Sequence, residues 1–316
     1  MQLQTDTAKV SVSGTVTDFG SSFRSVGLAV GLEDVIEARA IAGPTRLTLT
    51  GEATDDPSIQ GVAADDHPTV HALHSLLDTV GSSQVGLHLQ YRGRVPTMAG
   101  LGTRTNQILA GLLVGRQLLG EPEPLTDGLV ESMAVSLGAN RLRVRAILGG
   151  PLVVGLPDPI RAETDFSPGR PLAWLGSDTS ETAPDSDTAS PYWQGDVASP
   201  ISPSAFVPSV RVGARSRYAK TPSVARFSDA ADTSGRAGML VAALLGSSTT
   251  VGTLSEDALQ ELLLAATVDE LRQTDTKERL PASFALVQWL QSLGIPAFIS
   301  GEGPAVITLL PLPREV

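Results

Sequence analysis

The chain has 316 residues, of which 41% are hydrophobic, with a net charge of −11 and no cysteine. This length allows one large core or two smaller ones, and two domains is our expectation. The acidic balance, without a long basic run, argues against nucleic acid as a partner, and the lack of cysteine excludes disulfides and thiolate catalysis. We find neither a signal-peptide pattern nor an apolar run of membrane-spanning length, so we expect a soluble, cytoplasmic protein with no membrane partner.

In the first half, a polar glycine loop at residues 17–30 follows the first expected strand and leads into an apolar segment. Asp18 and Arg24 are the polar residues of this loop that could bind a zwitterionic ligand, although solvent-facing loop charges would give the same pattern. His71 and His74 are spaced i, i+3, but two histidines without a third ligand favour a solvated helix face over a metal site. The expected elements are strands at 9–16, 34–37 and 45–50, a helix at 69–81 capped by Thr69, a strand at 85–91, helices at 108–118 and 126–137, and a strand at 151–156.

Residues 95–107 combine the end of a strand, a glycine turn and the first turn of a helix. The backbone N–H groups at a helix start have no partner within the helix and lie at the positive end of the helix dipole. Glycines let an anion approach such a backbone closely, and Arg104 would add positive charge at the mouth. The segment therefore suits an anion such as phosphate, although a plain strand-to-helix turn would also use glycines for its geometry.

Three arginines alternate along residues 138–150, namely Arg141, Arg143 and Arg145. They would share one face only if this segment were extended, whereas on a helix they would spread around its circumference. The sequence leaves the choice between these two conformations open.

The second half contains a break in composition at residues 176–204, where Ser, Asp, Thr, Pro and Ala dominate and aliphatic periodicity disappears. This composition predicts a disordered or loosely packed insertion. Helices are expected at 236–245, 255–271 and 283–293, followed by strands at 297–299 and 305–310 around a glycine turn at 300–304. The whole pattern predicts an α+β fold in two parts, residues 1–155 and residues 156–316, with the acidic insertion in the second.

Three separated motifs resemble those of the GHMP small-molecule kinases, and among them the homoserine kinases. The family's first motif, P-A-T-S-A-N-L-G-P-G-F-D-x-L-G-L-A-L, is similar to S-G-T-V-T-D-F-G-S-S-F-R-S-V-G-L-A-V at residues 13–30. Its second motif, P-x-x-x-G-L-G-S-S-A-A, resembles the segment that contains Pro96, Gly100, Leu101 and Gly102. The third, S-G-A-G-P-T, resembles S-G-E-G-P-A at residues 300–305. The motifs occur in the family's order over matching distances.

This resemblance implies an N-terminal half like the second domain of ribosomal protein S5, which would bind the nucleotide, and a ferredoxin-like C-terminal half. It also implies ATP as the cofactor, with its phosphates on the second motif. The residues matched to the nucleotide site are Pro96, Gly100, Leu101, Gly102, Thr103 and Arg104. The substrate would lie between the first motif and the C-terminal half, and the residues matched to it are Asp18, Arg24, Arg236, Gly301 and Gly303.

The chain departs from the family at the positions that hold magnesium. The family's Ser-Ser pair is replaced by Thr103-Arg104, and its acidic ligand in E-G-H-P-D-N falls on Leu137. Mg²⁺ prefers oxygen ligands, whereas an arginine repels the ion and pairs with phosphate itself. Thr103 and Arg104 are therefore only candidates for a catalytic role, and no metal ligand is assigned.

Two further departures concern the substrate. Asp18 replaces an Asn of the first motif and Arg24 replaces an Asp, so the amino group of homoserine would meet an arginine in place of a carboxylate. Together with Arg104 and Arg141, Arg24 would place several positive charges around one pocket, unless these side chains simply face solvent.

Two main hypotheses follow. The first is a homoserine kinase-like, ATP-dependent phosphotransferase that acts on the hydroxyl of a small amino-acid-like substrate, with phosphoryl transfer helped mainly by positioning and charge neutralisation. The second is a catalytically inactive GHMP-fold protein, a pseudokinase, that binds an anionic small molecule or a protein partner. A third, different reaction in the same pocket has less support. The use of Mg²⁺ and the formation of a homodimer are left open.

Overall fold

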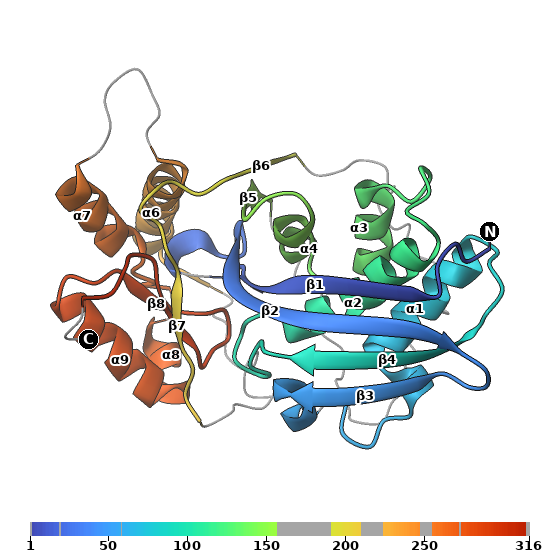
Figure 1. Ribbon diagram of the computed structural model, residues 1–316. Helices are drawn as coiled ribbons and strands as arrows, with labels where there is room; N and C mark the ends of the chain where they lie inside the picture. Colours follow the sequence, from blue (N-terminus) through green and yellow to red (C-terminus); the bar gives the residue numbers. More distant parts are fainter. Residues whose placement is uncertain are drawn as a thin grey trace.

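The computed structural model describes residues 2–18, 20–57, 59–156, 191–209, 224–246, 255–271 and 273–313. These residues form an α+β structure with two sheets, each covered by its own group of helices (Figure 1). The predicted α+β class agrees with this arrangement. Among the described residues, no helix is both long and apolar enough to cross a membrane.

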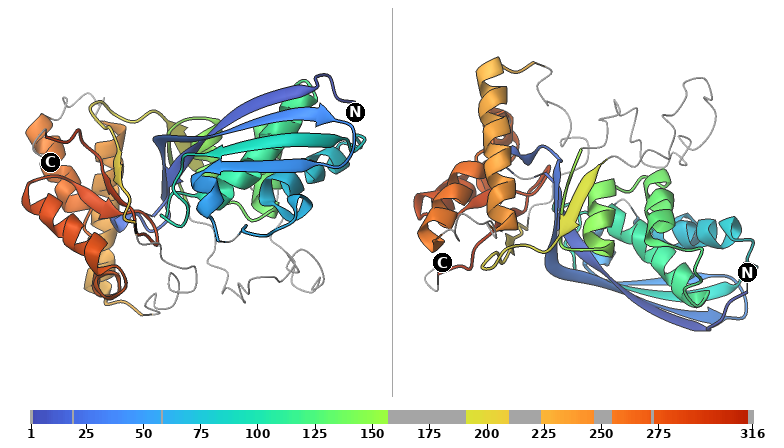
Figure 2. Two further views of the ribbon diagram at one scale, coloured as in Figure 1. Left: turned by 60° about the horizontal axis from the view of Figure 1, so that its bottom comes forward. Right: turned by 90° about the horizontal axis from the view of Figure 1, so that it is seen from above.

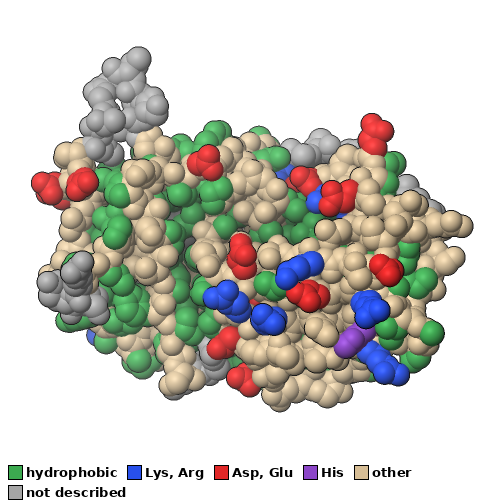
Figure 3. Space-filling view, viewed as in Figure 1, with side chains coloured by type: hydrophobic (Ala, Val, Ile, Leu, Met, Phe, Trp, Pro, Cys, Tyr) green, Lys and Arg blue, Asp and Glu red, His purple; other side chains and the backbone are tan. Residues whose placement is uncertain are grey.

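The first sheet has six strands, five of them in the order β3-β4-β2-β5-β6, and β1 pairs with β2 on the edge opposite to β4 and β5. The helices of the N-terminal half lie on one face of this sheet, as the view from above shows (Figure 2). The opposite face is open and carries side chains of both charge signs (Figure 3). The elements are β1 (Thr7–Val16), β2 (Val26–Ile41), β3 (Arg46–Gly51), β4 (Gly86–Gly93), β5 (Leu152–Gly155), β6 (Tyr192–Gly195), α1 (Pro68–Thr79), α2 (Thr103–Leu118), α3 (Asp127–Ser136) and α4 (Arg141–Leu148), with short 3₁₀ helices η1 (Gly20–Ser22), η2 (Glu52–Asp55) and η3 (Ala64–Asp66).

The alternation of side chains along the strands explains why only one face is covered. In β4, Leu87, Leu89 and Tyr91 are buried under the helices, while Gln90 and Arg92 between them are exposed. Successive side chains of a strand point to opposite faces, so this alternation directs an apolar face to the helices and a polar face to solvent.

The second sheet is small and antiparallel, with the order β7-β9-β8. A core formed between the two sheets contains Val16, Val26 and Leu101 from the first part and Leu240 and Phe298 from the second. The apolar residues around the first two motifs therefore pack against the C-terminal half. The elements of this half are β7 (Ser204–Phe206), β8 (Ala297–Ile299), β9 (Val306–Thr308), α6 (Phe227–Leu245), α7 (Glu256–Ala266), α8 (Gln273–Arg279) and α9 (Pro281–Ser292).

Two local predictions need correction. The predicted strand at 34–37 is the middle of the sixteen-residue β2, whose two edges are paired with β1, β4 and β5. The cap of α1 is His67, whose Nδ1 accepts a hydrogen bond from the backbone N–H of Thr69 at 3.2 Å. Pro68 occupies the first helical position, where its missing N–H costs nothing, so the cap lies two residues before the predicted one.

The predicted insertion at 176–204 is only partly within the described residues, because residues 157–190 lie outside them. Its last part is ordered: β6 pairs antiparallel with β5 and extends the first sheet. A short strand needs backbone partners more than aliphatic periodicity, and β5 supplies them. The domain boundary at residue 155 stays a prediction, since a strand beyond it joins the first sheet.

Candidate functional site between three glycine turns

The second motif begins directly after β4 and is anchored by Asp34 of β2, which is fully buried. One carboxylate oxygen accepts the N–H groups of Arg94 and Val95 at 2.8 and 2.9 Å. The other accepts the Tyr91 hydroxyl at 2.8 Å and the Asn106 amide at 3.2 Å. These four hydrogen bonds compensate the burial of a charged group and connect β2, β4, the turn and the first helical turn of α2.

Asp34 was not selected from the sequence as a site residue. The signal that could have singled it out is a lone carboxylate in the middle of a strand that is otherwise apolar on its buried side. The pKa of Tyr91 is raised, mainly because its phenol group is buried. The negative charge of the adjacent Asp34 carboxylate raises it further.

The start of α2 presents an uncapped helix terminus. Gly102 is the N-cap residue, with a left-handed φ of 84°, and no side chain caps the helix. Gly100 is also left-handed, at φ 89°, and a Cβ there would lie 2.1 Å from the backbone oxygen of Ser300. Glycine is therefore required at Gly100 both by its conformation and by the approach of the third turn.

The two residues that replace the family's serine pair lie at the first positions of α2. The Thr103 hydroxyl is half-buried and donates a long hydrogen bond of 3.5 Å to the Pro96 carbonyl. The Arg104 side chain is exposed by surface area, yet partial burial of its guanidinium lowers its pKa, while nearby Asp56 acts in the opposite direction. Arg104 thus lies between solvent and the buried Asp56, which also accepts the Gln107 amide at 3.2 Å.

The three motifs meet through backbone hydrogen bonds. The N–H of Gly301 donates to the Asp18 carbonyl at 2.7 Å, which joins the third motif to the first. The Ser300 hydroxyl donates to the Gly100 carbonyl at 3.0 Å, which joins the third to the second. The N–H of Thr15 donates to the Leu101 carbonyl at 2.9 Å, which joins the first to the second. Segments nearly 300 residues apart in sequence therefore form one compact set of turns.

The predicted substrate residues are distributed around these turns. Asp18 is buried and contacts the third motif through its backbone. Arg24 is half-buried, with a left-handed φ of 66°. Gly301 and Gly303 are both left-handed, at φ 55° and 71°, and form the third turn itself.

Arg236 of α6 lies beside the loop of the first motif. Its guanidinium donates to the Ala265 carbonyl at 2.6 Å and forms an ion pair with Glu270 at 3.0 Å. The Ser21 hydroxyl donates to the next carbonyl, that of Ala266, at 2.9 Å. Arg236 therefore connects α6 to the end of α7, and a contact between Arg236 and substrate stays a prediction.

Arg143 of α4 reaches all three turns, and it was not selected from the sequence. One guanidinium nitrogen donates to the carbonyl of Thr15 and, at 3.1 Å, to its hydroxyl. The other donates to the Gly100 carbonyl at 3.2 Å. A Cβ at Gly102 would lie 2.5 Å from Arg143 Nη1, and one at Gly301 would lie 3.8 Å from Nη2. A positive side chain is therefore placed against the start of α2 and between the three motifs.

The other two arginines of the run lie on a different face of α4. Arg141 and Arg145 both form ion pairs with Glu131 of α3, at 2.7 and 2.8 Å. Arg145 is 4% exposed, and its guanidinium stacks 3.4 Å from the ring centroid of Tyr192 in β6. The charge of Arg141 is thus neutralised between α3 and α4, so Arg141 does not join the expected set of pocket arginines.

These turns fit a phosphate group but not a magnesium ion. The uncapped start of α2, the two left-handed glycines and the neighbouring guanidinium groups suit an anion. Leu137, at the position of the family's acidic ligand, is 8% exposed and packs in the apolar core. Within the part of the chain that the structure describes, no three His, Cys, Asp or Glu residues are grouped in a way that could hold a metal ion. His71 and His74 therefore belong to no such group.

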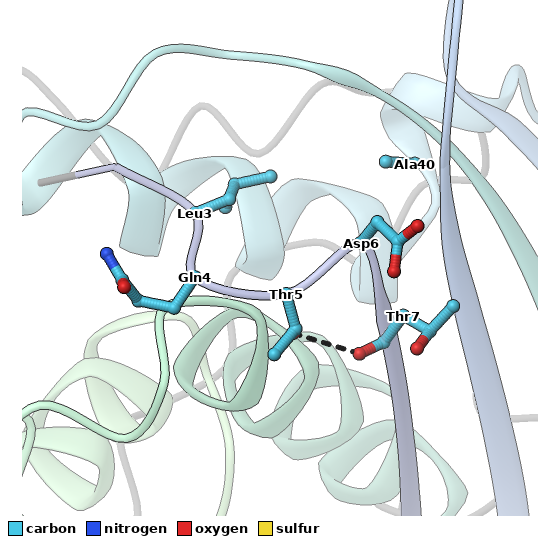
Figure 4. A pocket seen from close by; sticks show the side chains of 6 residues that line it. All are labelled: Leu3, Gln4, Thr5, Asp6, Thr7 and Ala40. Atoms are coloured by element: carbon cyan, nitrogen blue, oxygen red, sulfur yellow. Dashed lines mark hydrogen bonds between the residues drawn. The ribbon is translucent and has the colours of Figure 1, made fainter.

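A hollow at the other end of β1 has no such features (Figure 4). Its volume is about 610 Å³, and Asp6 is its only charged side chain. The ten-residue β1 separates it from the first motif by roughly 30 Å. It is lined by Leu3, Gln4, Thr5, Asp6, Thr7 and Ala40.

Comparison with known proteins agrees with this fold. No family model matches the chain. A homoserine kinase of Streptomyces coelicolor is 28% identical over 303 residues, which cover 95% of this chain and 84% of the relative. A homoserine kinase of Rhodococcus opacus is 28% identical over 318 residues, which cover 99% and 90%.

The solved structures extend this similarity to the whole fold. The structure of homoserine kinase from Cytophaga hutchinsonii superimposes with a TM-score of 0.71 at 20% identity and covers 100% of this chain and 88% of that one. The mevalonate kinase of Methanococcus jannaschii superimposes with a TM-score of 0.61 at 9% identity, covering 98% and 92%. By sequence the chain is similar to homoserine kinases, and its fold is similar to those of homoserine kinase and mevalonate kinase.

Proposed function

We propose that this chain uses the site between its three glycine turns to bind an anionic small molecule, and that it does so without magnesium-dependent phosphoryl transfer. The observation that carries this proposal is the set of residues at the start of α2. Arg104 occupies the position of a magnesium-binding hydroxyl in the resembled motif, and Arg143 contacts the same turn. Leu137, in place of the acidic ligand, is part of the apolar core.

The geometry supports anion binding for a physical reason. An uncapped helix terminus supplies N–H donors and the positive end of a dipole, and an arginine adds charge-assisted hydrogen bonds in a planar fork. The resemblance makes ATP the first ligand to test, with its phosphates held by Gly100, Leu101, Gly102 and the first residues of α2.

A second candidate function is ATP-dependent phosphorylation of a small amino-acid-like hydroxyl, as the similarity to homoserine kinases suggests. It is favoured by the meeting of all three motifs in space and by 28% identity over 95% of the chain. In this case Thr103, whose hydroxyl lies at the first position of α2, would be the residue left to assist the reaction.

One experiment separates the two functions. The protein is incubated with ATP, Mg²⁺ and a panel that contains homoserine and threonine, ADP formation is followed, and thermal unfolding is measured with and without ATP. We expect a thermal shift without turnover. Turnover with any substrate of the panel would instead support the kinase, and neither turnover nor a shift with ATP, ADP or pyrophosphate would refute both functions.

A restored variant tests the role of the metal. Arg104→Ser combined with Leu137→Glu returns the two expected magnesium ligands. If the lost ligands explain the loss of transfer, the double variant should gain Mg²⁺-dependent binding of ATP. The single variant Arg104→Ser is the matched control, because it removes the positive charge without supplying a carboxylate.

A further inference from the structure

The loop that joins η1 to β2 is attached to both halves of the molecule. The Ser21 hydroxyl donates to the Ala266 carbonyl of α7 at 2.9 Å, and η1 packs against α6. At the other end of the loop, the Ser25 carbonyl accepts the N–H of Gly155 in β5 at 2.9 Å. The residues between these two contacts are therefore held from both sides.

Two of these residues, Phe23 and Arg24, have an unusual backbone conformation. Their φ angles are 43° and 66°, in the left-handed region that glycine adopts freely and bulky residues rarely do. Among the described residues, they are the only two consecutive non-glycine residues with positive φ. Such strain persists only where the surrounding structure imposes it, and it is concentrated at ligand-binding sites. The conformation of this pair therefore points to a function for one of the two side chains.

The side chain of Arg24 differs from those of the other arginines that are not fully exposed. It is half-buried, and within the described part of the chain it has no ion pair and no side-chain hydrogen bond. Arg143 is bonded to backbone oxygens. The remaining described arginines of this class each form an ion pair with a carboxylate, namely Arg116, Arg141, Arg145, Arg236 and Arg279. A half-buried guanidinium without a counter-charge inside the fold has lost part of its hydration, so an anion from outside would gain by pairing with it.

The loop of Arg24 borders the anion site at the junction of the two halves (Figure 1). Asp18, at the beginning of the loop, accepts the N–H of Gly301 with its carbonyl at 2.7 Å. A Cβ on Gly301 would lie 3.8 Å from the carbonyl oxygen of Gly100 in the second motif. The strained pair and the guanidinium without a counter-charge thus belong to the group of turns that includes the start of α2.

We propose that Arg24 is a specificity residue that binds a carboxylate, so that the site takes a small organic acid with no ammonium group near the first loop. This inference rests on the anion-binding function proposed above and adds one residue and the class of ligand. A guanidinium forms two parallel hydrogen bonds with a carboxylate, whereas it repels an ammonium group. The left-handed pair fixes the direction in which the side chain leaves the loop, which lowers the entropy lost on binding.

The test compares ligands that share a hydroxylated carbon chain. They are L-homoserine, 4-hydroxybutyrate, which lacks its amino group, and 3-aminopropan-1-ol, which lacks its carboxylate. Dissociation constants are measured by ligand-observed NMR titration. The hydroxybutyrate should bind roughly tenfold more tightly than homoserine, and the amino alcohol should not bind measurably, because like charges repel in a half-buried site. Homoserine or the amino alcohol binding as tightly as hydroxybutyrate would overturn the proposal.

Pyrophosphate, titrated into the same protein, reports separately on the start of α2. If pyrophosphate binds and no organic probe does, the role of Arg24 is wrong and the anion-binding function stands. If hydroxybutyrate binds and pyrophosphate does not, Arg24 is supported and the phosphate site is wrong. If neither binds, both are refuted.

Variants identify the residue. Arg24→Gln should weaken the binding of hydroxybutyrate about tenfold, because it removes the charge, and Arg24→Asp should reverse the preference towards the amino alcohol. Arg24→Gly is the decisive variant, because glycine relieves the left-handed strain. It should unfold at a temperature close to or above that of wild type and yet lose affinity for the acid. The matched control is Arg39→Gln, on the exposed face of β2, which should stay within about twofold of wild type. Wild-type affinity in Arg24→Gly would refute the proposal, whatever the folding of the other variants.

Discussion

The two faces of α4 show how the same residue type can serve different purposes two positions apart. Arg141 and Arg145, four residues apart, lie together and share the Glu131 carboxylate of α3. Arg143 lies between them in sequence, and its guanidinium reaches the backbone of two distant motifs. A helix turns about 100° per residue, so i and i+4 share a face while i+2 faces away from both.

The two faces differ in what their guanidinium groups contact within the fold. On the Glu131 face, both guanidinium groups are used within the fold, and Arg145 is also covered by Tyr192. On the Arg143 face, the contacts described above are to neutral oxygens at the mouth of an uncapped helix. The first face should therefore determine stability and the second affinity.

The largest effect is expected when the shared carboxylate is removed. Glu131→Gln leaves Arg145, at 4% exposure, without its counter-charge, and breaking a buried ion pair costs about 3–5 kcal/mol of unfolding free energy. Chemical denaturation measures this change. The control is Glu37→Gln, whose partner Lys9 is exposed and which should change stability little. Similar denaturation midpoints for the two variants would show that the Glu131 cluster is not structural.

A second stability effect depends on pH and involves a buried histidine at the start of α1. Burial, opposed by nearby Asp56, lowers the pKa of His67 from 6.5 to about 4. The unfolded chain therefore binds a proton that the folded chain refuses, so the contribution is complete above pH 6.5 and is lost as pH falls towards 4. The loss should reach about 3 kcal/mol.

The slope of stability against pH between 6.5 and 5 tests this effect, because most carboxylates stay ionised in that window. His67→Gln should flatten the slope, whereas His88→Gln, on the open face of the sheet, should leave it unchanged. An unchanged slope in His67→Gln would contradict the assignment to His67.

An intermediate effect is expected on the other face of α4. Arg143→Met removes hydrogen bonds to neutral backbone oxygens and should lower the unfolding free energy by about 1–2 kcal/mol, clearly less than Glu131→Gln does. The order of the two variants should reverse when the affinity for pyrophosphate is measured. Folded Glu131→Gln should keep its affinity, whereas Arg143→Met should lose it. Parallel losses of stability and affinity in both variants would remove the distinction between the two faces.

The smallest effect concerns Arg104, which is exposed at the start of α2. Arg104→Met should weaken pyrophosphate binding by no more than about fivefold, since an exposed charge pair contributes up to about 1 kcal/mol. The effect should diminish as salt is added. A larger loss than in Arg143→Met would make Arg104 the main cation of the site.

The sequence permitted a good prediction of the elements that have local signals. The glycine turn before α2 and the helix starts near residues 126 and 255 follow from residues within one helical turn. The His67 cap was missed because histidine is an uncommon cap and Thr69, two residues later, is a usual one. Strand β6 was missed because its stability comes from pairing with β5 and not from its own composition.

The sequence by itself determined the resemblance to homoserine kinases, the expected α+β class and the replacement of the residues expected to bind magnesium, because each depends on residue identity at fixed spacing. The tertiary structure decided which arginine reaches the site, since residues 141–148 form a helix and only a folded chain brings Thr15, Gly100 and Gly301 together. The physical reason is that side-chain chemistry is local to a residue, whereas the direction of a side chain and its partners depend on segments far away in the sequence.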